Sequence, residues 1–221
     1  MKGLFITGTD TNVGKTYIAC QIATALASQN INVIPRKPVE TGCDLINGVL
    51  QAEDATLLLN ASKSNSTIDE VCPYRFSPAI SPQLAMQLAG HSVSLNELIT
   101  ASTNNLSEDD FLLVEGAGGF YSPICTGALN ADLAAHLKLP IILVTEDRVG
   151  AVNQVLLAIN AIEKHQLNIL AVILNTTHEP NSNNLSDNAA EIKALVPHPV
   201  ILIPYKQPIS TDLLSQLHLS V

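Results

Sequence analysis

The segment of this chain that most clearly indicates its fold is the loop Gly8-Thr9-Asp10-Thr11-Asn12-Val13-Gly14-Lys15-Thr16. It follows an apolar run at residues 3–7, which predicts a strand, and it opens residues 15–28, where apolar side chains recur at helical spacing. A strand, a Gly-Lys-Thr loop and a helix in this order are typical of a phosphate-binding P-loop. The spacing departs from the usual pattern in one respect, because Thr9 stands where the first glycine is expected and that glycine is displaced to Gly8.

The residues of this loop suit the binding of a metal-bound polyphosphate. Gly14 lets backbone N–H groups approach phosphate oxygens closely at a helix N-terminus. Lys15 would reach the β- and γ-phosphates, and the Thr16 hydroxyl would bind Mg²⁺. The alternative is an ordinary polar turn that ends in a helix cap, and the order of strand, Gly-Lys-Thr and helix disfavours it.

Short apolar runs alternate with helical patterns along the rest of the chain. We expect strands at residues 3–7, 31–37, 111–115, 140–145, 169–175 and 200–203. We expect helices at residues 15–28, 50–60, 83–89, 95–101, 131–137, 152–165, 184–195 and 211–217. This alternation predicts an α/β fold, a parallel central sheet flanked by helices on both faces, in a single domain over residues 1–221. Ligands bind such sheets at the carboxyl ends of the strands.

The composition excludes several classes of protein. Apolar residues make up 47% of the 221 residues, which argues against disorder, and no apolar run approaches the ~18 residues of a membrane helix. The 11 Lys+Arg and 20 Asp+Glu give a net charge of −9, which argues against a nucleic-acid partner. The four cysteines show no C-x-x-C spacing, so we expect reduced thiols in a cytoplasmic protein.

Two acidic residues and one lysine are candidates for the neighbourhood of the phosphates. Glu115 ends the apolar strand at residues 111–115, the position of the carboxylate that meets the metal in P-loop proteins. Asp54 is either a second metal ligand or an acid that interacts with a helix dipole, and the sequence leaves both readings open. Lys37 follows the second strand, and strand alternation sends Arg36 and Lys37 to opposite faces. At most one of these two cations therefore faces the loop.

Further motifs fall in a specific order along the chain. They are Thr7–Thr11 with Val13–Thr16, Lys37-Pro38-Val39, Val114-Glu115-Gly116-Ala117-Gly118-Gly119, residues 140–144, Gly150 with Asn153, Asn175, and Ile203-Pro204. With this order and spacing, the chain resembles the dethiobiotin synthetase family over essentially its whole length. The resemblance implies an ATP-dependent carboxylation of 7,8-diaminopelargonate with CO₂, followed by closure of the ureido ring in biotin synthesis. The absence of a Ser or Cys nucleophile paired with a His base agrees with such chemistry.

The resemblance also implies roles for individual residues. Lys37 and Lys15 are implied to be catalytic, and Thr16, Asp54 and Glu115 to hold Mg²⁺. The implied ATP site comprises Asn12, Val13, Gly14, Lys15, Thr16, Asp54, Glu115, Gly116, Ala117, Gly118, Asn175, Thr176, Pro204 and Tyr205. The implied substrate contacts are Thr11, Lys37, Thr41, Gly150 and Asn153, the last two across the interface of a homodimer.

The chain departs from well-known members of the family at several positions. Asn12 replaces a glutamate, Thr41 replaces a serine, Gln83 stands where some members carry histidine, and residues 205–209 lack an acidic residue.

Three other functions are less compatible with the sequence. A partition-type or septum-placement switch ATPase carries a signature lysine where this chain has Asp10. An amidotransferase synthetase of corrin side chains needs a glutaminase domain, for which 221 residues leave no room. A non-catalytic nucleotide-binding regulatory domain would keep the loop but would not need Lys37 or the implied substrate contacts.

Overall fold

The computed structural model describes residues 1–179 and 187–207. Its central sheet has six strands, all paired in parallel, in the order β12-β11-β10-β1-β7-β2. They are β1 (Lys2–Gly8), β2 (Val33–Arg36), β7 (Phe111–Gly119), β10 (Ile141–Glu146), β11 (Ile169–Asn175) and β12 (Val200–Ile203). The predicted parallel sheet is confirmed, and the helix expected at residues 211–217 lies outside the described residues.

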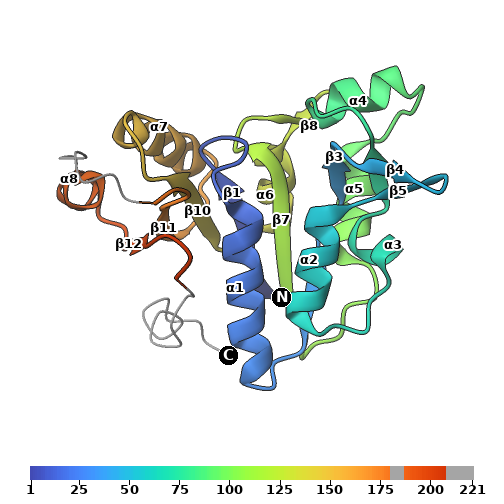
Figure 1. Cartoon of the computed structure of the whole chain (residues 1–221), viewed down its shortest axis with the longest axis horizontal. Coiled ribbons are helices and arrows are strands. Elements are labelled where there is room, and N and C mark those ends of the chain that lie inside the picture. The colour runs from blue at the N-terminus through green and yellow to red at the C-terminus, as the bar shows by residue number, and fades with distance from the viewer. Residues whose placement is uncertain (180–186, 208–221) are drawn as a thin grey trace.

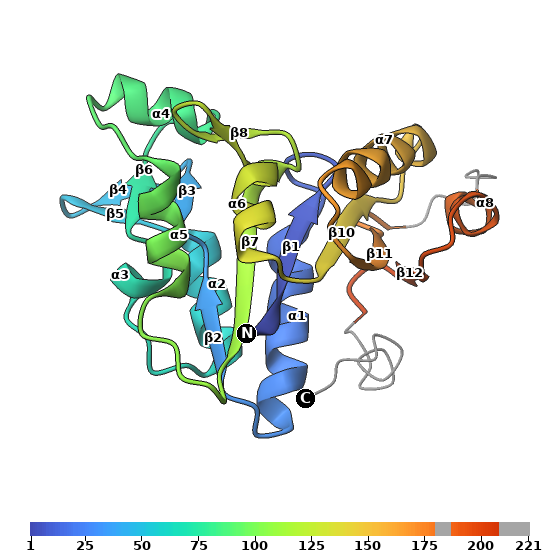
Figure 2. The same ribbon diagram turned by 180° about the vertical axis from the view of Figure 1, so that it is seen from behind.

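Helices cover both faces of the sheet, as predicted. Figure 1 shows α1 (Lys15–Ser28) and α2 (Glu53–Ser62) in front of the strands. The view from behind in Figure 2 shows the opposite face, with α5 (Leu95–Thr103), α6 (Asn130–Leu137) and α7 (Ala151–Lys164). Beyond them, α8 (Asn188–Leu195) packs beside β12, and the short helices α3 (Ile68–Val71) and α4 (Pro82–Leu88) lie near the other edge.

Strand alternation divides the core into two apolar layers. Leu4 and Ile6 of β1 pack with Ile18 and Ile22 of α1, whereas Phe5 between them packs on the opposite side with the residues of α6 and α7. Leu4, Phe5, Ile6, Ile18 and Ile22 are all fully buried. Successive side chains of a strand point to opposite faces, so a strand covered by helices on both sides must be apolar throughout. The continuous apolar runs in the sequence have this physical cause.

Three small two-stranded sheets were not predicted. The parallel pair of β3 (Val39–Thr41) and β6 (Tyr74–Phe76) follows β2, and the other two are antiparallel: β4 (Asp44–Ile46) with β5 (Val49–Gln51), and β8 (Pro123–Cys125) with β9 (Ala128–Leu129). Asn47 and Gly48 join β4 to β5 with φ of 53° and 80°. Asn-Gly is the preferred dipeptide of a two-residue hairpin turn with both φ angles positive.

This hairpin corrects the predicted start of the second helix. The expected helix at residues 50–60 begins only at Glu53, because Leu50 and Gln51 pair with β4 in the hairpin. The four cysteines are free, in agreement with the expectation of reduced thiols. Over residues 1–179 and 187–207, no helix is long and apolar enough to cross a membrane.

Candidate active site

The loop after β1 is held at the carboxyl end of the sheet by close packing. Gly14 precedes α1 with a φ of 93°, a left-handed conformation that favours glycine. A Cβ atom at this position would overlap the Nδ2 atom of Asn175, so any larger residue here would have to displace the Asn175 amide. Asn175 also donates a hydrogen bond from Nδ2 to the carbonyl oxygen of Val13, at 3.2 Å. The loop is therefore fixed by Asn175 at the end of β11, a residue that the family resemblance implies to be part of the ATP site.

Lys15 folds back across this loop. Its Nζ donates to the carbonyl oxygen of Asp10 at 2.8 Å, and only 6% of the residue is exposed. Burial lowers the pKa of Lys15 to about 8, because it outweighs the favourable charge of Glu115. The ammonium group therefore begins to lose its proton just above neutral pH, unless a bound anion raises its pKa again.

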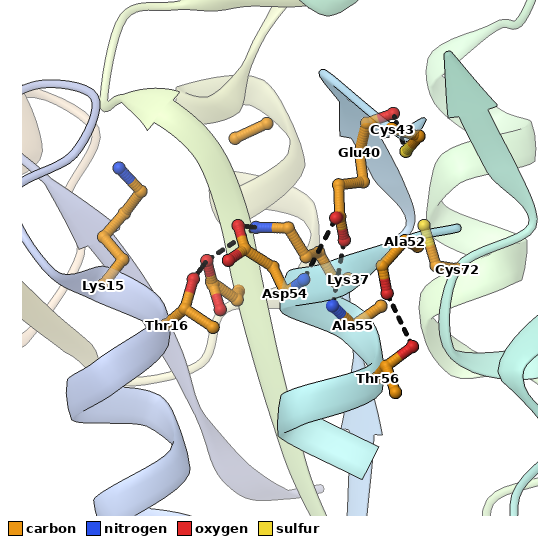
Figure 3. Close-up of polar contacts among 12 residues, drawn as sticks. Lys15, Thr16, Lys37, Glu40, Cys43, Ala52, Asp54, Ala55, Thr56 and Cys72 are labelled. Carbon is orange, nitrogen blue, oxygen red and sulfur yellow. Dashed lines mark hydrogen bonds and ion pairs between the residues drawn. The ribbon is translucent and has the colours of Figure 1, made fainter. Parts of the chain in front are cut away.

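Lys37 lies at the centre of a buried charge cluster. Its Nζ is 2.6 Å from Glu115 Oε1. The same Nζ is 3.3 Å from Asp54 Oδ2 (Figure 3). The Thr16 hydroxyl donates to the same Glu115 oxygen at 2.8 Å. Burial alone would lower the pKa of Lys37, but the charges of Glu115 and Asp54 outweigh it and raise the pKa. Lys37 is therefore held as a cation, and Arg36 points elsewhere, as strand alternation predicted.

These groups line one cavity of about 330 Å³ between the loop, β3 and the start of α2. It brings together eleven of the residues predicted from the sequence: Thr11, Asn12, Gly14, Lys15, Thr16, Lys37, Thr41, Asp54, Glu115, Ala117 and Gly118. It also contains Glu40, which was not predicted. The signal that could have identified Glu40 is its place three residues after Lys37, in a segment that is otherwise apolar or small.

The remaining predicted residues lie outside this cavity. Val13 is buried beneath the loop, and Gly116 packs against Asn130. Thr176, Pro204 and Tyr205 follow β11 and β12, where the Thr176 amide donates to the carbonyl oxygen of Ile203 at 3.0 Å.

Gly150 and Asn153 are exposed at the start of α7 and do not line the cavity that contains Lys37. Another hollow, of about 400 Å³, lies between Asp10, Phe120 and Leu157 of the same helix. A single chain therefore does not bring the start of α7 to the charge cluster.

The donor set beside Lys37 fits a Mg²⁺ ion. Glu115 Oε2 is buried and has no hydrogen-bond partner among the described residues, and the Asp54 side chain is 44% exposed to the cavity. With the Thr16 hydroxyl, these are the oxygen ligands that Mg²⁺ prefers, and the ion keeps several waters. Within residues 1–179 and 187–207, no three His, Cys, Asp or Glu side chains gather into a metal site. Phosphate oxygens and water would therefore have to complete the coordination.

Comparisons with known proteins agree with this geometry. The family model for an AAA domain matches residues 2–211. Among solved structures, a ParA family ATPase from Chlorobium tepidum superposes with a TM-score of 0.58 at 17% identity and covers 98% of this chain and 89% of its own. The septum site-determining protein MinD from Pyrococcus horikoshii, complexed with Mg-ADP, gives 0.54 at 16% identity, with 99% and 94% covered. Fold and site together define a P-loop nucleotide-binding protein.

Curated relatives identify the family within this class. The ATP-dependent dethiobiotin synthetase BioD of Vesicomyosocius okutanii is 44% identical over 192 residues, 87% of this chain and 85% of that protein. The enzyme of the same name from Alteromonas mediterranea is 35% identical and covers 97% of each chain. The chain belongs to the ATP-dependent dethiobiotin synthetase family. The ParA and MinD structures share only the fold, which leaves the switch-ATPase alternative without support from sequence identity.

Proposed function

We propose that the chain is an ATP-dependent cyclo-ligase that converts 7,8-diaminopelargonate, CO₂ and ATP into dethiobiotin, ADP and phosphate. One substrate amine adds to CO₂ to form a carbamate, and the γ-phosphoryl group of ATP is transferred to the carbamate oxygen. The second amine then attacks the carbamate carbon and expels phosphate, which closes the cyclic urea. The observation that carries the proposal is the single cavity shared by Lys37, Glu115 and the phosphate loop.

The side chains support this reaction through positioning and charge. Lys15 and the amides of the loop would hold the ATP phosphates at the start of α1. Lys37, kept protonated by Glu115 and Asp54, would stabilise the negative charge that develops on the carbamate and the transferred phosphoryl group. Mg²⁺ held through Thr16, Asp54 and Glu115 would neutralise phosphate charge.

The substrate would lie on the other side of Lys37 from the nucleotide. Thr11 and Thr41 line the cavity and can hydrogen-bond the diamine. Gly150 and Asn153 would bind the substrate carboxylate from a second copy of the chain, at the start of α7. The exposed apolar residues Val149 and Leu157 of the same region support a homodimer there.

The adenine would lie beside Asn175, Thr176, Pro204 and Tyr205, at the ends of β11 and β12. We further propose that residues 1–221 act as one catalytic domain in the cytoplasm, in line with the free thiols.

The test is a reconstituted reaction. Purified protein is mixed with 7,8-diaminopelargonate, bicarbonate and MgATP, and dethiobiotin is measured by mass spectrometry alongside ADP. We expect both products in equal amounts and no dethiobiotin without the diamine. ATP turnover that is indifferent to the diamine would contradict the proposal, and a monomeric mass at the assay concentration would contradict the dimer.

A further inference from the structure

The start of α2 lacks the cap that most helices carry. Its N-cap residue is Ala52, which has no side-chain oxygen and is 1% exposed. The first amides of a helix have no partner within the helix, and burying them without one is unfavourable. A helix that begins in a buried position with alanine at its N-cap needs an acceptor from elsewhere in the fold.

Glu40 supplies that acceptor from β3. Its Oε1 accepts a hydrogen bond from the Asp54 amide at 3.1 Å, and its Oε2 accepts one from the Ala55 amide at 2.9 Å (Figure 3). These are the second and third residues of α2, whose amides a capping side chain normally binds. Glu40 is 6% exposed, so water competes little for either bond.

Asp54 is consequently held at two points. Glu40 binds its main-chain amide, and Lys37 binds its carboxylate at 3.3 Å. Lys37 and Glu40 are only three residues apart, on the short segment that runs from the end of β2 into β3. The side chain of Asp54 is 44% exposed, so its position depends mainly on where the first turn of α2 is placed.

Glu40 is less available as a metal ligand than Glu115. Both of its oxygens are engaged by helix amides, whereas Glu115 has an oxygen with no partner among the described residues. Its place in the cavity wall is therefore explained by the helix that it anchors.

We propose that Glu40 is a positioning residue that clamps the start of α2, so that Asp54 and Lys37 keep a fixed separation in the active site. The metal-side carboxylate and the catalytic lysine then move as one unit. The inference deepens the proposed function and rests on it for the metal role of Asp54, but the clamp itself is a property of the fold.

The clamp is tested first without activity, by amide hydrogen exchange followed by NMR. Glu40→Ala removes both acceptors, and we expect the amides of Asp54 and Ala55 to exchange at least about tenfold faster while the amides of α1 are unchanged. Glu53→Gln is the matched control, because Glu53 is an exposed acid in the same first turn. Unchanged protection of both amides in Glu40→Ala overturns the clamp, whether or not the protein makes dethiobiotin.

The consequence for the site is tested with Glu40→Gln, which keeps the size of the side chain. We expect the Mg²⁺ concentration for half-maximal rate, at saturating ATP, to rise about tenfold, since removing such supporting contacts weakens metal sites by that order. In an Asp54→Asn background the same change should add little, because both substitutions act on one carboxylate.

The kinetics can overturn the proposed role of Glu40 in two ways, and a stability measurement combined with them gives a third. One is a Glu40→Gln protein that matches Glu53→Gln in Mg²⁺ dependence, and the other is an effect that is fully additive with Asp54→Asn. A lowered unfolding temperature with unchanged Mg²⁺ dependence also counts against it, because that is the signature of a purely structural cap.

Discussion

Arg36 and Lys37 are adjacent cations, 2% and 3% exposed, yet they have opposite surroundings. Lys37 meets two carboxylates. Arg36 donates instead to the carbonyl oxygens of Pro35 and Asn104, both at 2.9 Å, and its Nε has no partner among the described residues. Burial lowers the pKa of Arg36, whereas the carboxylates raise the pKa of Lys37. Burial alone therefore does not distinguish a catalytic cation from a structural one. The distinguishing feature is a pair of carboxylates beside the cation.

Arg36 and Lys37 also line different cavities. Lys37 faces the cavity of the phosphate loop, whereas Arg36 lines another cavity, of about 420 Å³, beside α3 and α5. A single step along the chain, at the end of β2, separates a group that can act on a substrate from a group that ties β2 to the end of α5. Parallel substitutions at the two positions test this difference directly.

The largest effect is expected from Lys37→Met. Loss of the ammonium group removes charge stabilisation in the transition state, so we expect kcat to fall about 10³-fold, with ATP affinity changed only a few-fold. Single-turnover rates and ATP titrations check the two quantities separately. Equal losses in rate and in ATP affinity would mean that Lys37 serves only the nucleotide.

The loss of rate on removing each of the two carboxylates around Lys37 should follow their distance from Lys37 and their burial. Glu115→Gln removes the closer, fully buried partner, and we expect an approximately 10²-fold loss of rate. Asp54→Asn removes the more distant and half-exposed partner, and we expect a loss of about tenfold, because solvent screens it. Rates measured at saturating Mg²⁺ decide the order, and the reverse ranking would contradict the geometry.

A pH effect should arise from Lys15 rather than from Lys37. The pKa of Lys15 is lowered to about 8, so the fraction that carries the proton falls about tenfold between pH 7 and pH 9, and ATP affinity should fall with it. Lys37 stays charged over this range because its pKa is raised. Calorimetric titration at several pH values measures the effect. Lys15→Arg should abolish the dependence, and its persistence in that variant would assign it to another group.

The smallest effect is expected from Arg36→Met. The side chain is replaced by an apolar one of similar length, and the lost cation has no carboxylate partner within the described residues. We expect a rate within about threefold of the original, and an unfolding free energy lowered by about 1–3 kcal/mol because the carbonyl oxygens of Pro35 and Asn104 lose their donor. Chemical denaturation and the product assay check both. A rate loss comparable to that of Lys37→Met would remove the distinction between the two residues.

Local patterns predicted the sheet and the main groups of the site well. The apolar strands and the Gly-Lys-Thr loop are short-range signals, and Lys37 directly follows β2 at the carboxyl edge of the sheet. Glu115 was expected to end its strand, but β7 continues to Gly119, and Glu115 pairs within it with Ile6 of β1, two residues before β1 ends. Asp54 lies in the first turn of α2, as the helix-dipole reading requires, and 3.3 Å from Lys37, so its metal role stays a prediction.

Other features depend on contacts that no local pattern contains. Glu40 caps a helix that begins thirteen residues later, and only the folded chain brings the two together. The hairpin of β4 and β5, by contrast, could have been predicted, because Asn47-Gly48 is a local signal for its turn. This hairpin is the reason why α2 starts later than expected. Gly150 and Asn153 do not line the cavity of Lys37 in one chain, so their proposed role needs a second copy.

The contact between Gly14 and Asn175 limits how this sequence can change. Any side chain at position 14 would overlap the amide of Asn175, and shortening residue 175 to make room would remove the bond that holds Val13. Even a paired change leaves the new residue at position 14 with a φ of 93°. The two positions, 161 residues apart, are therefore coupled: a side chain at position 14 requires a change at position 175 and still carries the cost of a left-handed backbone, about 1–3 kcal/mol.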